Sequence, residues 1–246
     1  MRLAVTYDVE SLPVDYRMPM LSLVKESLRR ANPKYFEKLY VAGEGKMKPF
    51  STAVYLHRFA YENDRIKLDA FTLTISSPDM EFMLHLFNGL QQIAEYRTDG
   101  TIWKRTQIRM VQETDIVGDR VWFRTLSPVL IEDRNGKPLG PEQPHYVEEF
   151  GYFAEMRIRE LTGREPYRPI VMQPGNMRKQ IVKERNSVFR QQFGNEQGQR
   201  WLYYTAYQGT LKLEGHPEDL KLLYQAGVGK RASQSFGLLD YVREEG

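Results

Sequence analysis

The chain has 246 residues, of which 41% are hydrophobic and 12% aromatic, so it is long enough to bury a substantial core. Its 35 Lys and Arg residues against 32 Asp and Glu give a formal net charge of only +3, which permits nucleic-acid binding without requiring it. Cysteine is absent, which excludes disulfides, thiolate metal sites and thiol nucleophiles, and the sequence shows neither a signal peptide nor an apolar stretch of membrane-spanning length. We therefore expect a cytoplasmic globular protein that is not held in a membrane.

The first half of the chain predicts the element order strand, helix, strand, strand, helix, strand. Apolar residues alternate with other residues in the strands and recur every three or four residues in the helices, as at Leu21, Val24 and Leu28. The predicted elements are a strand at 2–9, a helix at 21–31 with a short helical piece after Asn32-Pro33, strands at 50–56 and 71–75, a helix from Ser77-Pro78 to about residue 93, and a strand at 106–116.

The second half predicts the same order again. Its elements are a strand at 121–126, a helix at 147–161 that ends near Gly163, strands at 180–183 and 201–213, a helix at 217–226 and a strand at 236–242. Two copies of this split βαβ order predict an α+β protein made of tandem ferredoxin-like βαββαβ domains, with residues 1–118 in the first and 119–246 in the second. Each sheet then has two helices on one face, an arrangement that supports many functions.

The stretch AGVGKRASQSFGLLDY at 226–241 combines three glycines with two cations. A Walker loop needs glycine at Tyr224 and Ser or Thr at Arg231, and a dinucleotide fingerprint needs a helix after the glycines, whereas here the predicted helix comes before them. Gly227 is explained as the left-handed residue that ends the helix. The loop as a whole fits either a turn without function or a cradle for phosphodiester oxygens, formed by Gly227, Gly229, Lys230, Arg231, Ser233, Ser235 and Gly237.

This loop resembles a known family. Together with AYQGTLKLEGHPEDLKLLYQ before it and LSPVL at 126–130, it is similar to the C-terminal half of the CRISPR-associated endoribonucleases that process precursor CRISPR RNA, the sixth numbered Cas family of the RAMP superfamily. That family has a late loop of the form glycine, apolar, glycine, variable residues and a glycine–apolar pair. Residues 227–238 fit this form, and Leu239 stands where a further glycine is common. The N-terminal half resembles the family in its opening strand, at Asn32-Pro33 and in KPFSTAVYL. The resemblance implies tandem ferredoxin-like domains.

The resemblance also implies RNA cleavage without metal or cofactor, in which a 2′-hydroxyl attacks the adjacent phosphate and leaves a 2′,3′-cyclic phosphate and a 5′-hydroxyl. Many members carry a histidine shortly before a lysine that precedes an aromatic strand. Here Lys48 takes the lysine position and Ala42 the histidine position, so the usual general base is missing. Either the member holds RNA with little or no cleavage, or alanine is an engineered replacement that traps substrate. Tyr40 is a poor base at a pKa of about 10, and Lys46 and Lys48 are candidates for charge stabilisation or for a merely solvated loop.

The remaining candidates are histidines, basic residues and aromatic residues. All four histidines, at 57, 85, 145 and 216, are predicted to be structural, none has metal-motif spacing, and His57 is the best substitute base among them. Two basic clusters fit either a phosphate track or solvated faces, and the aromatic residues of the strand at 201–213 fit either base stacking or a core. These residues are Lys25, Arg29, Arg30, Lys34, Lys38, Lys46 and Lys48 in the first cluster, Arg178, Lys179, Lys183, Arg185 and Arg190 in the second, and Trp201, Tyr203, Tyr204 and Tyr207 in the strand.

The leading hypothesis is thus a metal-independent endoribonuclease that acts on CRISPR repeat RNA, the repeat segment of precursor CRISPR RNA. The alternative is a non-catalytic RNA-binding subunit of a CRISPR ribonucleoprotein, and a third interpretation is a ferredoxin-like module that binds a small molecule or a protein. Expected partners beyond RNA are other CRISPR effector subunits and a second copy of the chain in a homodimer.

Overall fold

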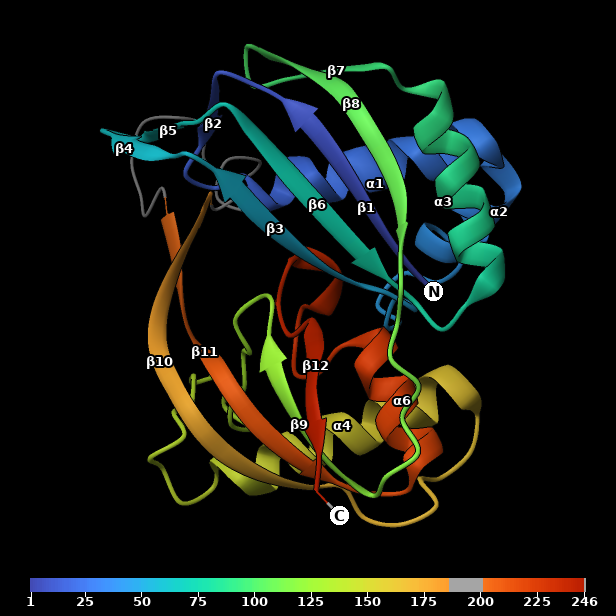
Figure 1. The fold of residues 1–246 in the computed structure, drawn as a ribbon, viewed down its shortest axis with the longest axis vertical. Helices are drawn as coiled ribbons and strands as arrows, with labels where there is room; N and C mark the ends of the chain where they lie inside the picture. The colour runs from blue at the N-terminus through green and yellow to red at the C-terminus, as the bar shows by residue number, and fades with distance from the viewer. Residues whose placement is uncertain (186–200, 246) are drawn as a thin grey trace.

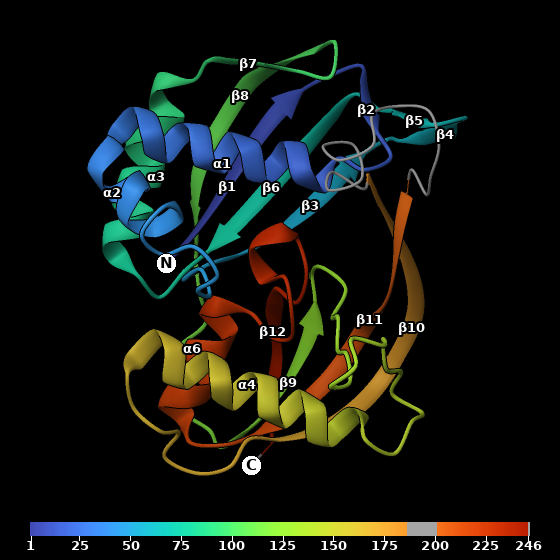
Figure 2. The same ribbon diagram turned by 180° about the vertical axis from the view of Figure 1, so that it is seen from behind.

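A computed structural model describes residues 1–185 and 201–245 of the chain. Two antiparallel sheets lie one above the other in Figure 1, and the helices of both halves cover the same side of the molecule, which faces the viewer in Figure 2. No helix among the described residues is long and apolar enough to cross a membrane.

The first sheet has the strand order β3-β6-β1-β8-β7 and carries helices α1 and α3 on one face. Leu3, Val5 and Tyr7 of the central strand point into the same core as the buried stripes of the two helices. A short helix, α2, follows α1 directly after Asn32, whose side chain caps it. The elements are β1 Arg2–Asp8, α1 Arg17–Ala31, α2 Pro33–Tyr40, β3 Ser51–His57, β6 Ala70–Ser76, α3 Met80–Gln92, β7 Glu95–Thr98 and β8 Thr101–Val111.

The second sheet has the order β10-β11-β9-β12. Helices α4 and α6 pack on it and close a second core around Phe123, Phe150 and Leu223. The elements are β9 Arg120–Thr125, α4 Tyr146–Thr162, β10 Val171–Arg185, β11 Trp201–Glu214, α6 Pro217–Ala226, a 3₁₀ turn η1 Ala232–Gln234 and β12 Leu239–Glu244. In both sheets the third strand of the βαββαβ unit pairs with the first, and the second and fourth lie outside them. The predicted tandem ferredoxin-like fold is confirmed, while the division at residue 118 stays a prediction.

Several predicted strand limits are wrong. The strand expected at 106–116 is β8, which begins at Thr101 because Asp99-Gly100 form a two-residue turn that pairs β8 with the unexpected β7. The strand expected at 180–183 is the much longer β10, which continues through a bulge between Pro174 and Met177. The last strand begins at Leu239 rather than 236, and α3 begins after Asp79.

A small three-stranded sheet was not predicted. It has the order β2-β5-β4, formed by β2 Ser11–Pro13, β4 Ala60–Glu62 and β5 Arg65–Lys67. Three-residue strands are too short for an alternating pattern to show, which explains why the sequence did not reveal them. This sheet lies beside the far end of the β10–β11 hairpin in both views (Figures 1 and 2). Ion pairs join the two regions, from Arg185 to Asp15 and from Lys183 to Asp64.

Candidate functional site

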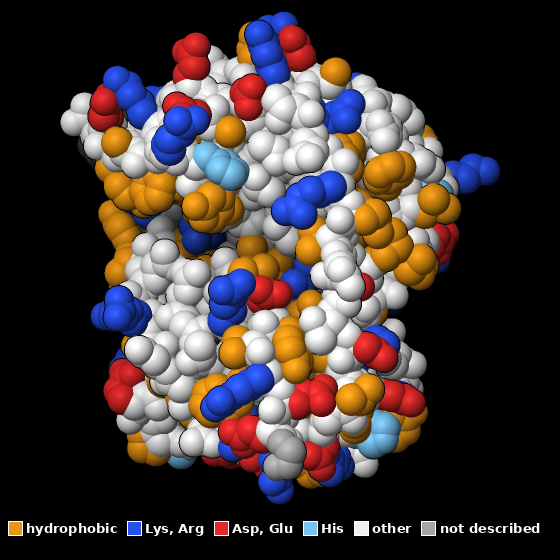
Figure 3. All heavy atoms as spheres, in the orientation of Figure 1, with side chains coloured by type: hydrophobic (Ala, Val, Ile, Leu, Met, Phe, Trp, Pro, Cys, Tyr) orange, Lys and Arg blue, Asp and Glu red, His pale blue; other side chains and the backbone are white. Residues whose placement is uncertain are grey.

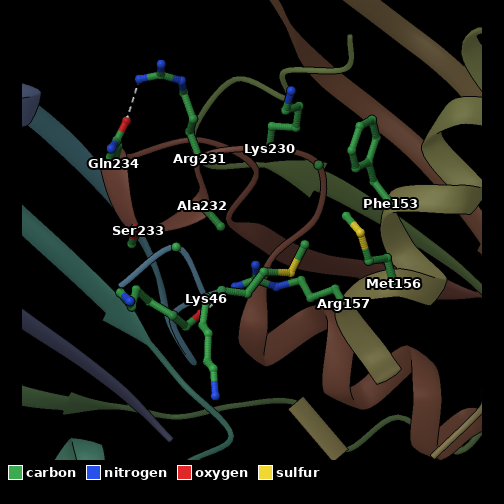
Figure 4. Close-up of a pocket in the computed structure, with 13 residues that line it drawn as sticks. Lys46, Phe153, Met156, Arg157, Lys230, Arg231, Ala232, Ser233 and Gln234 are labelled. Atoms are coloured by element: carbon green, nitrogen blue, oxygen red, sulfur yellow. Dashed lines mark hydrogen bonds between the residues drawn. The ribbon is translucent and has the colours of Figure 1, made fainter. Parts of the chain in front are cut away.

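A pocket of about 320 Å³ lies where the two halves of the molecule meet. Three segments line it: the loop 45–48 before β3, one turn of α4 with Phe153, Met156 and Arg157, and the loop 229–234 after α6 (Figure 4). The first and third of these segments are the ones that the sequence singled out, and they are about 180 residues apart in the chain. The fold therefore brings Lys46, Lys48, Lys230, Arg231 and Ser233 to one place.

Lys48 is held on the N-terminal side of the pocket. Its ammonium donates a hydrogen bond to the carbonyl oxygen of Gly43 (2.6 Å) and lies 5.3 Å from the centre of the Tyr40 ring. The ammonium of Lys25 lies 4.8 Å from the same ring. Burial, and next the neighbouring charge of Lys25, lower the pKa of Lys48 below its usual value. Lys46 is exposed beside it.

Tyr40 and Ala42 lie behind this loop and do not line the pocket. The Tyr40 hydroxyl is buried without a hydrogen-bond partner among the described residues, and burial raises its pKa, so the phenol keeps its proton at neutral pH. Ala42 is exposed in the turn after α2, where its N–H donates to the carbonyl of Glu37 (2.9 Å). None of the four histidines lines the pocket. His57 instead bonds to the Thr72 hydroxyl on the first sheet (2.8 Å).

Arg157 was not predicted as a site residue. It is only 3% exposed, and its Nη2 lies within hydrogen-bonding distance of the carbonyl oxygens of Lys48 (3.3 Å), Phe50 (3.2 Å) and Ala226. One side chain of α4 thus ties the loop before β3 to the end of α6. The sequence did carry a signal, because position 157 follows Ala154 by three residues on the buried stripe of the helix and yet is charged.

The loop after α6 is mostly buried, and its glycines have structural reasons. Gly227 has φ 81° and ψ 176°, so the expected left-handed helical conformation is wrong: this is an extended, positive-φ conformation that glycine alone adopts readily. Gly237 has φ 67°, and a Cβ there would lie 1.8 Å from the carbonyl oxygen of Val228. The Ser235 hydroxyl is buried against Thr52 of β3 (2.9 Å). Only the part from Gly229 to Gln234 reaches the pocket.

The two cations of this loop already have acidic partners. Lys230 pairs with Glu132, and Arg231 lies 3.5 Å from Glu184 and donates to Gln234 at 2.8 Å. The Arg231 guanidinium also stacks 4.2 Å from the Tyr204 ring centre. A phosphate that enters the pocket therefore competes with carboxylates for these two side chains.

The other predicted RNA-binding residues do not gather at the pocket. Arg29 pairs with Glu26 on α1, Arg178 and Lys179 are exposed along β10, and Lys183 and Arg185 join the hairpin to the first half. On the face seen in Figure 3, Lys and Arg side chains are scattered among acidic ones rather than collected in one patch. Lys183 also lies 4.0 Å from the Trp201 ring centre, Tyr203 is exposed and Tyr207 is buried. Arg190 lies outside the described residues.

Comparison with known proteins decides the family. Residues 111–241, more than half of the chain, match the family model described as CRISPR associated protein Cas6, C-terminal. The chain belongs to the Cas6 family. This confirms the resemblance noted in the sequence, and the matched region runs from the end of β8 into β12 and includes the whole glycine loop.

Solved structures share the fold over the whole chain. One is titled as a RAMP protein binding different RNA substrates (16% identity, 99% of this chain and 100% of that chain, TM-score 0.79), and another is a Cas6-related protein from Pyrococcus furiosus (16% identity, 100% of both chains, TM-score 0.79). A Cas6 product complex is also similar (14% identity, 98% and 99% of the two chains, TM-score 0.67). At these identities the likeness shows the fold alone. No curated protein matches the sequence significantly.

We predict that Gly237→Ala destabilises the protein much more than Gly100→Ala. Both glycines have positive φ, but a Cβ at Gly100 meets nothing within 4 Å, so that change carries backbone strain alone, about 1–2 kcal/mol. At Gly237 the clash with the Val228 carbonyl adds to the strain, for a total of about 3–4 kcal/mol. Urea unfolding of the two variants measures the difference, and equal losses would contradict the tight loop geometry.

We predict that Lys25→Met raises the pKa of Lys48. The substitution removes the positive charge that disfavours the Lys48 ammonium, and burial alone then remains to lower that pKa. The matched control is Lys34→Met, which removes an exposed lysine that is not among the groups acting on Lys48. NMR titration of the lysine ε-methylene signals measures both variants. An unchanged Lys48 pKa in Lys25→Met would show that the two ammonium groups are not coupled.

Proposed function

We propose that this chain binds CRISPR repeat RNA and that the pocket between its halves is the place where a Cas6-type cleavage step occurs or once occurred. The observation that carries the proposal is the meeting of the loop 45–48 and the loop 229–234 at one cationic pocket in a member of the Cas6 family. Two proteins of similar structure, a RAMP protein that binds different RNA substrates and a Cas6 product complex, support RNA as the ligand.

In the proposed reaction the 2′-oxygen forms a bond to the adjacent phosphorus while the bond from phosphorus to the 5′-oxygen breaks. A base takes the proton of the 2′-hydroxyl, an acid gives a proton to the leaving 5′-oxygen, and cations stabilise the charge on the phosphoryl oxygens. Lys48 suits the acid role, because its lowered pKa makes the ammonium a stronger proton donor. Lys46 supplies charge from the exposed side of the pocket. Neither group requires a metal.

The base is the missing part. Tyr40 is unsuited because burial raises its pKa and its hydroxyl is shut off from solvent. This observation favours the second candidate function, a subunit that holds repeat RNA without cutting it. Both functions use the same pocket and the same ligand, and they differ only in proton removal. Partnership with other CRISPR subunits, homodimer formation and the roles of Gly227, Gly229, Ser233, Ser235 and Gly237 toward RNA stay predictions.

We predict that Ala42→His gains cleavage of a CRISPR repeat RNA in EDTA. A histidine has an ordinary pKa of about 6.5, and its neutral form supplies the base that the chain lacks. The cleavage rate should therefore rise as the pH increases through that value. Gel mapping of the products, with a terminal 2′,3′-cyclic phosphate as the mark of the mechanism, measures it.

The unmodified chain is the control for this experiment. Cleavage by the variant alone supports a lost base at position 42. Cleavage by both proteins would mean that another residue is the base and that the assignment of Ala42 is wrong. Tight RNA binding with no cleavage by either protein would favour the non-catalytic subunit.

We predict that Lys46→Ala weakens binding of repeat RNA and reduces the slope of log K against log salt by about 0.7–1, as expected when one phosphate contact is lost. The double change Lys230→Ala and Arg231→Ala tests the opposite wall of the pocket in the same way. Lys221→Ala is the control, since this lysine of α6 is half-exposed, pairs with Asp115 and does not line the pocket. Filter binding at several salt concentrations measures all three, and equal effects of Lys46→Ala and Lys221→Ala would contradict the placement of RNA.

A further inference from the structure

Arg157 is a buried cation that has no acidic partner among the described residues. Its side chain is 3% exposed, and among the described residues it makes hydrogen bonds only to main-chain carbonyl oxygens. Burial lowers its pKa to about 10, so it still carries its charge at neutral pH, and no carboxylate acts to raise that pKa again. A buried charge is normally paired because desolvation is costly. The protein therefore keeps a positive charge at this place without supplying its counterion.

The three nitrogens of this guanidinium have different surroundings. Nη2 takes the three carbonyl contacts, and Nε is buried with no partner. Nη1 has no hydrogen-bond partner among the described residues. Arg157 lines the pocket, and Figure 4 shows its side chain extending from α4 toward the segment that carries Lys46. The two N–H groups of Nη1 are therefore not satisfied by the described residues, in a side chain that lines the pocket.

Arg2 offers a comparison within the same interface. It is also buried, at 2% exposure, and it donates to the carbonyls of Tyr224 (3.2 Å) and Leu239 (2.8 Å) near the end of α6. Unlike Arg157, it pairs with a carboxylate, that of Asp240 (3.4 Å), and it does not line the pocket. Holding the end of α6 therefore does not require an unpaired charge. The missing counterion of Arg157 needs another explanation.

We propose that Arg157 binds the RNA phosphate that enters the pocket, so that the ligand supplies the counterion and Arg157 stabilises the charge that builds on that phosphate during cleavage. This rests on the proposed function. A phosphodiester presents two non-bridging oxygens, and hydrogen bonds between a guanidinium and a phosphate are charge-assisted and strong. Because Arg157 also holds the main chain at Lys48 and Ala226, an anion bound to it stabilises the junction between the two halves.

The first test needs no RNA and uses inorganic phosphate with the full chain. Phosphate at several times its Kd, compared with chloride at equal ionic strength, should raise Tm by about 2–4 °C. The rise should disappear in Arg157→Gln and remain in Arg2→Lys, which changes a buried arginine of the same interface away from the pocket. An equal rise in Arg157→Gln and in the unmodified chain would overturn the proposal.

A second measurement avoids any variant that fails to fold. A crystal structure of the unmodified chain with phosphate should place a phosphate oxygen about 2.7–3.2 Å from Nη1 of Arg157. Phosphate bound only elsewhere, or no phosphate in the pocket at a concentration that raises Tm, would overturn the proposal.

The catalytic part is tested in the Ala42→His background with Arg157→Lys, which keeps the charge but loses the planar fork. The single-turnover cleavage rate should fall at least about 100-fold, as when one transition-state donor is lost, while the Kd for repeat RNA changes little. A purely structural role would instead lower Tm and change binding and rate together. If the unmodified chain binds no repeat RNA, the proposed function fails, and the phosphate experiments still decide whether Arg157 is an anion site.

Discussion

The C-terminal end of α6 is the point on which the rest of the structure depends. The last carbonyl groups of a helix have no partner within it and carry the negative end of its dipole. Here two buried arginines approach them: Arg2 from β1 reaches the Tyr224 carbonyl, and Arg157 from α4 reaches that of Ala226. The chain then turns at Gly227 into the glycine loop. One helix end thus fixes where the first sheet, the loop before β3 and the glycine loop stand relative to one another.

The other contacts between the two halves are of two kinds, buried hydrogen bonds and ion pairs. Thr52 and Ser235 share a buried hydrogen bond, and the Ser127 hydroxyl donates to the Thr52 carbonyl, so β3 is joined directly to the segments around the glycine loop. The ion pair of Lys183 with Asp64 is exposed and contributes little in water, whereas Arg185 pairs with the buried carboxylate of Asp15. The β10–β11 hairpin is therefore joined to the first half by ion pairs, whereas the segments around the pocket are joined by buried hydrogen bonds.

The sequence predicted the repeated element order and the importance of the glycine loop because both are encoded locally, in periodicity and in glycine spacing. It misplaced β8 and β10, where a two-residue turn and a bulge override the simple pattern. It could not predict which side chains face each other across the halves. It did not reveal that the Ser235 hydroxyl is bonded to that of Thr52, or that Arg157 contacts carbonyls more than 65 residues away. Such contacts follow from tertiary packing, which local pattern does not contain.

The side chains that line the pocket are suited to binding an anion, but they do not include an evident general base for cleavage. Burial keeps the Tyr40 phenol protonated at neutral pH, so it is not a ready base, and it makes the Lys48 ammonium a better proton donor. Positioning of the phosphate and stabilisation of its charge do not need a base. A protein that only held its two halves together would gain by pairing Arg157 with an acid, as Arg2 is paired with Asp240. The unpaired charge is explained if a phosphate completes the site, and that explanation is the same for a subunit that cuts RNA and for one that holds it.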